Sequence, residues 1–276
     1  MRKRNANSGA AGEHGGAART RSGAAPEHGG TQSIERAVAL LREISARGHF
    51  GWRLTDLADR CSLSKGTTHR MLMCLVRERL VKQRPNDRHY LPGPMLFELG
   101  LSLPELSALQ NKAKTWLAAL AKRRPSAAFL FFRSGDDFVC AEREGSTDLK
   151  ALTIFPGTRR PLATSAGGAA MLLDLPVPEA RATARRNLAS LTGYSRARLR
   201  AIRSMLERTN AARFAINAGD ILPGVNEYGL ALRDADGEPF ASIVLAGLDR
   251  ALPVSQLPEI RGWLQATAEE LQEKSP

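Results

Sequence analysis

A tight break between two short helical patterns is the feature that most limits how this chain can fold. The first pattern covers Leu54–Cys61, and the break is the segment "SLS" at residues 62–64. The second pattern begins after this break and reaches about Glu78. Apolar residues spaced by three and four predict an inward side that contains Leu54, Leu57, Ala58, Thr68, Met71, Leu72 and Leu75. Two helices joined by so short a turn are typical of a helix-turn-helix.

The segments on either side extend this motif. A helix is predicted before it over Ser33–Ala46, and Gly48 ends that helix. Its apolar face is expected to contain Ile34, Ala37, Val38, Leu41 and Ile44. Two short strands, Leu80–Gln83 and His89–Leu91, are predicted after it, joined by the turn-forming segment "RPNDR". Helix, helix, short turn, helix and hairpin together predict a winged helix-turn-helix.

The N-terminal half of the last helix is polar, and Ser64 is expected to cap it. In a winged helix-turn-helix this helix lies in the DNA major groove, with its first residues on base edges and phosphates. Gly66 would let the backbone approach a phosphate, and Arg84 and Arg88 flank the tip of the wing. The candidate DNA-binding residues are therefore Ser64, Lys65, Gly66, Thr67, His69, Arg70, Arg84 and Arg88. The alternative is an ordinary three-helix bundle with a polar end.

The distribution of charge favours the same partner. The chain has a formal net charge of +12, and residues 31–92 hold 12 Lys/Arg and 6 Asp/Glu. Half of the excess positive charge therefore lies in less than a quarter of the length. Concentrated positive charge indicates a polyanionic partner, most often nucleic acid. A solvated surface that keeps the protein in solution is the alternative.

The hydrophobic and charged fractions, 43% and 25%, are those of a soluble globular protein, and the use of cysteine is typical of a reducing cytoplasm. Residues 1–30 are rich in Gly, Ala, Ser and His and are predicted to form a disordered basic tail. The spacings between the three cysteines, Cys61, Cys74 and Cys140, do not resemble a Cys-x-x-Cys metal site. Cys61 and Cys74 are interpreted as small buried hydrophobic residues. The longest apolar run, Ala127–Phe132, is far too short to span a membrane, and "MRKR" has no apolar stretch after it.

Several stretches resemble the IclR family of bacterial transcription regulators. The N-terminal ones are "SIERAVALLREIS" and "LTDLADRCSLSKGTTHRMLMCLVRERLVKQRPNDRHYLPGPMLFELG". The C-terminal ones are "FPGTRRPLATSAGGAAMLL" and "GVNEYGLALRDADGEPFASIVLAG". The resemblance covers about residues 31–272 and implies a ligand-sensing domain related to the GAF fold. The expected organisation is a winged helix-turn-helix over 31–92, linker helices over 93–124 and an effector-binding domain over 125–276.

The pattern of the C-terminal part itself predicts an α+β domain. Linker helices are expected over Gly93–Leu103 and Glu105–Arg123. Strands are expected in "AAFLFFRS", "FVCAERE" and "KALTIFP", and near residues 213–217, 225–233 and 240–247. Further helices are expected over Thr164–Leu173, around Leu188, around Leu199, Ile202 and Leu206, and from Ser255 to about Gln272. Such a mixture predicts an antiparallel sheet with helices at its faces.

The resemblance implies an effector pocket against one face of that sheet. The residues at matching positions are Ala163, Thr164, Ser165, Ala166, Gly167, Asn217, Asp220, Glu227, Val244 and Ala246. The N–H groups of Ala166 and Gly167 could hold a carboxylate oxygen at a helix start. The alternative is a Gly/Ala-rich turn that lets a helix pack closely. Many members carry histidine at Ala163 and serines at Val244 and Ala246, so we expect a ligand with more apolar surface, or none. A small organic acid or aromatic compound is the expected class.

Three functions remain to be compared. The leading one is a DNA-binding regulator, a homodimer or homotetramer, whose operator affinity depends on a small ligand and which needs no cofactor. An enzyme is disfavoured because the sequence has no nucleophile elbow, Walker loop or metal spacing and no histidine beyond residue 89. A DNA-binding protein with a degenerate sensor is the third. The basic segment 181–208 is interpreted as a solvated helix face rather than a second DNA surface.

Overall fold

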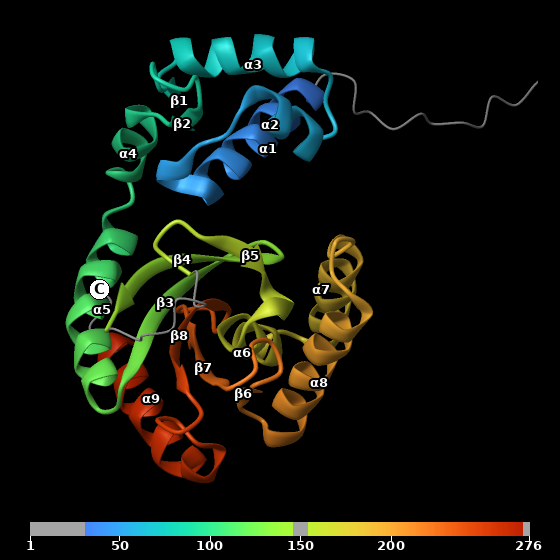
Figure 1. The fold of residues 1–276 in the computed structure, drawn as a ribbon. Helices are drawn as coiled ribbons and strands as arrows, with labels where there is room; N and C mark the ends of the chain where they lie inside the picture. Colours follow the sequence, from blue (N-terminus) through green and yellow to red (C-terminus); the bar gives the residue numbers. More distant parts are fainter. Residues whose placement is uncertain (1–30, 146–153, 273–276) are drawn as a thin grey trace, which may run out of the picture.

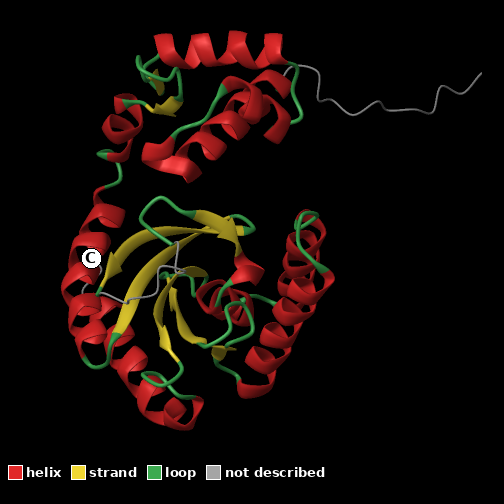
Figure 2. Cartoon of the chain, in the orientation of Figure 1, coloured by secondary structure: helices red, strands yellow, loops and turns green. Residues whose placement is uncertain are grey.

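The protein has two parts that are joined by a pair of helices. The computed structural model describes residues 31–145 and 154–272, and the expected tail at residues 1–30 lies outside these ranges. A small, mainly helical part comes first, and a sheet covered by helices follows (Figure 1; Figure 2). No helix within the described ranges is long and apolar enough to cross a membrane.

The first part has the element order of a winged helix-turn-helix. Its helices are α1 (Gln32–Arg47), α2 (Leu54–Arg60) and α3 (Lys65–Arg77), with a 3-10 turn over Gly48–Phe50 after α1. Strands β1 (Val81–Gln83) and β2 (Tyr90–Pro92) pair antiparallel and form the wing. The predicted order is therefore confirmed.

Tertiary contacts fix the wing to the first helix. The Trp52 indole N–H donates to the Glu43 carbonyl of α1 at 2.8 Å, and the Trp52 backbone pairs with that of Tyr90 on β2. Tyr90 is buried in the same apolar core as Leu72 of α3. The wing and the third helix are thus held in one rigid unit by a shared core.

The buried side of α1 differs from the predicted one. Leu40 and Ile44 are fully buried, whereas Ile34 is 64% exposed and Val38 is 37% exposed. Helical spacing fits either apolar stripe, but the core built from α2, α3 and the wing packs on the stripe that contains Leu40. The prediction that Ile34 and Val38 face the core was wrong, and α1 presents both to the outside.

Two helices link the parts, and each begins at a proline, whose fixed φ suits a first helical turn. α4 (Pro94–Gly100) has no buried residue, and its Phe97 is 71% exposed. An ion pair of 2.7 Å between Arg79 and Glu98 ties α4 to the segment after α3. α5 (Pro104–Lys122) then packs its apolar side onto the sheet of the second part.

The second part is built on a six-stranded antiparallel sheet with the order β5-β4-β3-β8-β7-β6. The strands are β3 (Ser126–Ser134), β4 (Asp137–Glu144), β5 (Arg159–Pro161), β6 (Ala215–Ala218), β7 (Val225–Arg233) and β8 (Pro239–Leu248). The central pair, β3 and β8, joins segments that are more than a hundred residues apart in the chain. The predicted α+β class with an antiparallel sheet is confirmed.

One edge strand lies further along the chain than predicted. In "KALTIFP", residues 150–153 lie outside the described ranges, and residues 154–156 are not in a strand. A turn at Gly157 instead brings the chain back to β4, where the Gly157 N–H donates to the Cys140 carbonyl at 2.8 Å. Strand pairing resumes only at Arg159. The prediction was therefore wrong at residues 154–156, because Pro156 and the following Gly157 form a turn before the strand begins.

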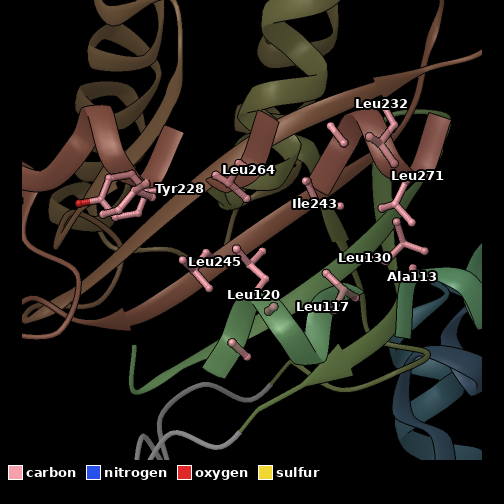
Figure 3. Close-up of a cluster of buried hydrophobic side chains, with 14 of the residues drawn as sticks. Ala113, Leu117, Leu120, Leu130, Tyr228, Leu232, Ile243, Leu245, Leu264 and Leu271 are labelled. Atoms are coloured by element: carbon pink, nitrogen blue, oxygen red, sulfur yellow. The ribbon is translucent and has the colours of Figure 1, made fainter. Parts of the chain in front are cut away.

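Helices cover both faces of the sheet. α5 and α9 (Leu257–Gln272) lie on one face, where Tyr228, Leu245 and the residues around them form a large buried cluster (Figure 3). The other face carries α6 (Ala166–Asp174), α7 (Val177–Ser190) and α8 (Arg196–Ala212) (Figure 1). The second cluster, on this other face, includes Phe129, Phe131 and Val244, together with Met171 and Leu172 of α6.

Candidate DNA-binding surface and effector pocket

The start of α3 is fixed by its own side chains. The Ser64 hydroxyl oxygen accepts from the Thr67 N–H at 3.2 Å, which is the predicted N-cap. The Thr68 hydroxyl donates to the Ser64 carbonyl at 3.0 Å, and its side chain is fully buried. Thr67 is half-buried and also accepts from the Ser64 hydroxyl. These bonds anchor the first turn, so that the residues between them are presented outward.

The outward face of α3 is polar and cationic. Lys65, Gly66, His69 and Arg70 are all exposed. Within the described part of the chain, neither Lys65 nor Arg70 has an ion-pair partner. Figure 1 shows α3 at the outer edge of the first part, on the side away from the six-stranded sheet. This arrangement leaves both cations available to an anionic surface.

The same face continues further along α3 than the sequence indicated. Met73 is 49% exposed, and Cys74 and Arg77 are exposed beyond it. They lie three, four and seven residues after Arg70, and residues at this spacing share one face of a helix. The spacing alone could therefore have placed them on the outward face of α3. The interpretation of Cys74 as a buried residue was wrong, because Cys74 lies four residues after Arg70 and shares its exposed face.

The two wing arginines are in different situations. Arg84 holds both carboxylate oxygens of Asp87, at 3.0 and 2.7 Å, and donates to the Phe50 carbonyl at 3.2 Å. This arginine lowers the pKa of the Asp87 carboxyl well below its usual range. Arg88 is exposed at the tip, with a positive φ of 61°. Arg84 therefore braces the wing, and Arg88 is the freer of the two to reach DNA.

The start of α6 is the centre of the expected effector pocket, and it already has internal partners. The Ala166 N–H donates to Glu227 Oε2 at 3.2 Å, and the Gly168 N–H donates to Ser165 Oγ at 3.0 Å. Both are first-turn N–H groups, which have no acceptor within the helix itself. Glu227 is only 6% exposed. The N–H of Ala166, which we expected to hold a ligand carboxylate, is thus occupied by a carboxyl group of the chain.

The sheet brings other expected pocket residues into one row under this helix. Asn217 on β6 lies opposite Glu227 on β7, and Glu227 lies opposite Ala246 on β8. Burial raises the pKa of Glu227 above its ordinary value of 4.5, although the Ala166 N–H, the Asn217 amide and the charge of Arg160 all lower it. Among the described residues, no acceptor lies within good hydrogen-bond geometry of the buried Asn217 Nδ2 atom, although this amide is close enough to Glu227 to lower the pKa of its carboxyl group.

Close packing of α6 on the sheet accounts for the small residues of the loop. A Cβ added at Gly167 would lie 2.4 Å from Val244 Cγ2 and 2.6 Å from Phe131 Cδ2. One added at Gly229 would lie 2.7 Å from the Ala166 carbonyl oxygen. The alternative reading of this loop, a Gly/Ala-rich turn that allows a close approach, therefore describes its packing correctly.

The remaining expected pocket residues support the loop rather than an open surface. The Ala163 N–H donates to Asn187 Oδ1 at 2.9 Å, and the Thr164 hydroxyl donates to the Pro161 carbonyl at 2.7 Å. Asp220 is ion-paired with Arg208 of α8, so one arginine of the basic segment has an internal role.

One polar residue of the same sheet face was missed from the sequence. Ser242 is fully buried, and its hydroxyl has no hydrogen-bond partner in the part of the chain that the structure describes. A single serine among apolar residues of a predicted buried strand was the available signal.

A metal site and a nucleophilic thiol are two features on which catalysis in the described part of the chain could depend. No cluster of three or more His, Cys, Asp or Glu residues there could hold a metal ion. Cys140 is buried in β4, and burial raises its pKa to about 12, which keeps the thiol protonated. Cys61 is half-buried at the end of α2. Burial also raises the pKa of Cys61, so neither of these two thiols resembles an activated nucleophile.

Comparison with known proteins gives a consistent family assignment. Residues 33–85 match the model of the IclR helix-turn-helix domain, and residues 105–273 match that of the bacterial transcriptional regulator IclR C-terminal domain. The chain is 28% identical over 244 residues to the glycerol operon regulatory protein of Streptomyces griseus, covering 82% of this chain and 95% of that protein.

Solved structures show the same fold. An IclR family transcriptional regulator from Brucella abortus aligns with a TM-score of 0.69 and 19% identity, covering 88% of this chain and 92% of that one. An IclR homolog from Microbacterium hydrocarbonoxydans, complexed with 4-hydroxybenzoate, aligns with a TM-score of 0.64 and 17% identity, covering 88% and 100%. With both domain models matched in order along the chain, this protein belongs to the IclR family of bacterial transcriptional regulators.

Proposed function

We propose that this regulator reads an operator through α3 and the wing, and that a small organic ligand held between α6 and the sheet changes its affinity for DNA. The observation that carries the proposal is that Lys65 and Arg70, on a helix whose start Ser64 fixes, are both exposed and have no ion-pair partner among the described residues. A rigid helix with cations at its outer N-terminal face suits the width and charge of the major groove. We expect it to act in the cytoplasm, where its DNA lies.

Support for a ligand comes from relatives. A regulator at 28% identity is named for the glycerol operon, and one solved structure of the same fold contains 4-hydroxybenzoate. Because the bound molecule in that structure is small and organic, we propose a ligand of the same size class for this chain. The buried polar atoms beside α6 support the position, since such atoms normally have partners in a working site.

We also propose a homodimer or homotetramer. One recognition helix covers one half-site, and symmetric dimers commonly bind two half-sites. Phe97 and Leu101 on and beside α4 are 71% and 63% exposed, and Ile34 of α1 is 64% exposed. Apolar side chains this exposed, close to a DNA-binding unit, favour pairing between copies of the chain.

The experiment begins with selection of bound sites from random DNA duplexes by the full chain. The expected result is one enriched sequence with two related half-sites, bound much more tightly than a scrambled duplex in fluorescence anisotropy. A screen of metabolites for a change in operator affinity then tests the ligand. Recovery of no preferred sequence would contradict operator reading. A preferred site that no metabolite affects would favour a degenerate sensor.

A further inference from the structure

A cleft separates the DNA-binding part of the chain from the six-stranded sheet. We call it the interdomain cleft, and it is lined from within residues 39–46 of α1, 60–61, 159–161 and 190–194, together with Asp137. Its volume of about 630 Å³ lies within the range of small-molecule sites, which are often found where two domains meet. Figure 1 shows α1 on the side of the first part that faces β4 and β5. The parts touch beside β5, where a Cβ added at Gly157 would lie 3.8 Å from the Ser45 carbonyl oxygen of α1.

One face of α1 forms a wall of the interdomain cleft. Ala39, Arg42 and Ala46 line it at a spacing of three and four residues, so they share one side of the helix. The two alanines are small and leave space in front of this wall, whereas the Arg42 side chain is exposed. The opposite side of α1 carries Leu40 and Ile44, which are buried in the helix-turn-helix core. The same helix therefore contributes to the core and to the cleft.

Positive charge predominates in the interdomain cleft, which four arginines and two acids line. Each acid is already ion-paired, Glu43 with Arg60 at 3.1 Å and Asp137 with Arg159 at 2.7 Å. The Arg159 guanidinium is fixed further by Ser134, whose hydroxyl and carbonyl oxygens each accept from it at 2.9 Å. The two ion pairs neutralise themselves, and the cleft keeps an excess of two positive charges.

The excess charge lies on two arginines that come from different parts of the molecule. Arg42 of α1 has no ion-pair partner among the described residues. Arg160 is half-buried in the middle of β5, and its charge is near enough to Glu227 to lower the pKa of that carboxyl group. Arg42 therefore belongs to the DNA-binding part, and Arg160 to the domain that contains α6. Two like charges repel each other across a cleft, and an anion between them is attracted by both.

The third wall supplies neutral hydrogen-bond donors. The turn between α7 and α8 places the exposed Thr192 and the half-buried Tyr194 at the interdomain cleft. Their hydroxyl groups can donate to the oxygen atoms of an anion, and a guanidinium binds a carboxylate or a phosphate through two parallel hydrogen bonds. Because each of the two arginines can bind one anionic group, the charge and the donors of the cleft suit a molecule with two negative charges.

We propose that the interdomain cleft is a ligand site for a small organic dianion, a dicarboxylate or a phosphate monoester, which binds between Arg42 and Arg160. This site shares no residue with the proposed effector position at α6, so it goes beyond that function. The bound dianion connects α1 to the sheet, and α1 shares its apolar core with α3. Binding should therefore restrict how α3 is presented to DNA.

Isothermal titration calorimetry on the full chain without DNA tests the site. The probes are succinate and phthalate as dicarboxylates and phenyl phosphate as a phosphate monoester, near neutral pH and at constant ionic strength, with acetate as the singly charged control. Wild type should give a saturable isotherm with at least one dianion and a much weaker response to acetate. Arg42→Ala and Arg160→Gln should each bind that dianion at least about tenfold more weakly, because a hydrogen bond to a charged group contributes about this much.

Arg203→Ala is the matched control, because it removes an exposed arginine of α8 that does not line the interdomain cleft. Its affinity for the dianion should equal that of wild type. A wild type that binds none of the three dianions would overturn the proposed ligand class. Unchanged affinity in Arg42→Ala, whose exposed side chain can be removed without disturbing the fold, would place the dianion elsewhere and overturn the site. Since calorimetry uses no DNA, a failure of operator reading would not affect these results.

Discussion

Replacing Gly167 by alanine should loosen the contact between α6 and the sheet. The new Cβ would lie 2.4 Å from Val244 Cγ2, about an ångström closer than ordinary contact, with Phe131 at 2.6 Å and Ser242 Oγ at 2.9 Å behind it. Overpacking of this kind costs about 1–3 kcal/mol, and alanine recovers about 1 kcal/mol through helix propensity. We therefore expect Gly167→Ala to lower the free energy of unfolding by up to about 2 kcal/mol, and to leave it about 1–3 kcal/mol below that of a variant that gains the same helix propensity without the clash.

Urea unfolding followed by circular dichroism measures this change. A control variant and a double variant test whether the clash at Gly167 is its cause. Gly66→Ala on α3 is the matched control, because an added Cβ there meets nothing within 4 Å. Val244→Ala removes the atom that clashes, so the double variant Gly167→Ala, Val244→Ala should be about 1 kcal/mol more stable than additivity predicts. Strict additivity, or a Gly167→Ala variant as stable as Gly66→Ala, would refute the described packing of α6.

Three other predictions concern charge, assembly and the tail. Because the pKa of Glu227 is raised, the folded protein still holds a proton above pH 4.5 that the unfolded chain has released. The free energy of unfolding should therefore fall as pH rises above 4.5. Urea titrations of Glu227→Gln should not show this fall. Light scattering should show a dimer or tetramer that Phe97→Glu weakens, and a monomeric wild type would contradict the assembly. Deleting residues 1–30 should leave operator specificity unchanged and slightly weaken nonspecific binding in anisotropy assays, because that segment carries a net positive charge.

Features that depend on neighbouring residues could be predicted from the sequence. The Ser64 cap, the break before α3 and the Thr68 side of that helix follow from spacing within a few positions. The pairing of Arg84 with Asp87, three residues apart, could also have been anticipated, but the arginine was assigned to DNA alone. Local patterns identify a cation readily, but its partner depends on the turn that brings the two together.

Features that depend on distant residues could not be predicted. The bond between Ala166 and Glu227 joins positions 61 residues apart, and only the strand register places that carboxyl group under α6. The choice between the two apolar stripes of α1 depends on which side α3 and the wing cover, so Ile34 was assigned to the core although it is exposed. In both cases the residue type was informative and the tertiary neighbour decided its role.

The central claim is that α3 reads DNA with base-specific and phosphate contacts at different depths. Binding of Arg70→Ala and Lys65→Ala to operator and scrambled duplexes across a salt series tests it most directly. Both side chains are exposed, so neither change should affect folding. Arg203→Ala on α8, which removes an exposed arginine far from α3 in the chain, controls for the loss of charge alone.

Arg70→Ala should cost about 1–3 kcal/mol on the operator and relax the preference at one base position per half-site, because a guanidinium can bond a guanine edge through two parallel hydrogen bonds. Lys65→Ala should weaken both duplexes alike and reduce the salt dependence by about one phosphate contact per subunit. If Arg70→Ala loses the same affinity for the operator and for the scrambled duplex, Arg70 contacts phosphate, and Thr67 or His69 must contact the bases instead. If Arg70→Ala and Lys65→Ala both bind the operator with the same affinity as Arg203→Ala, the proposal that α3 reads DNA is contradicted.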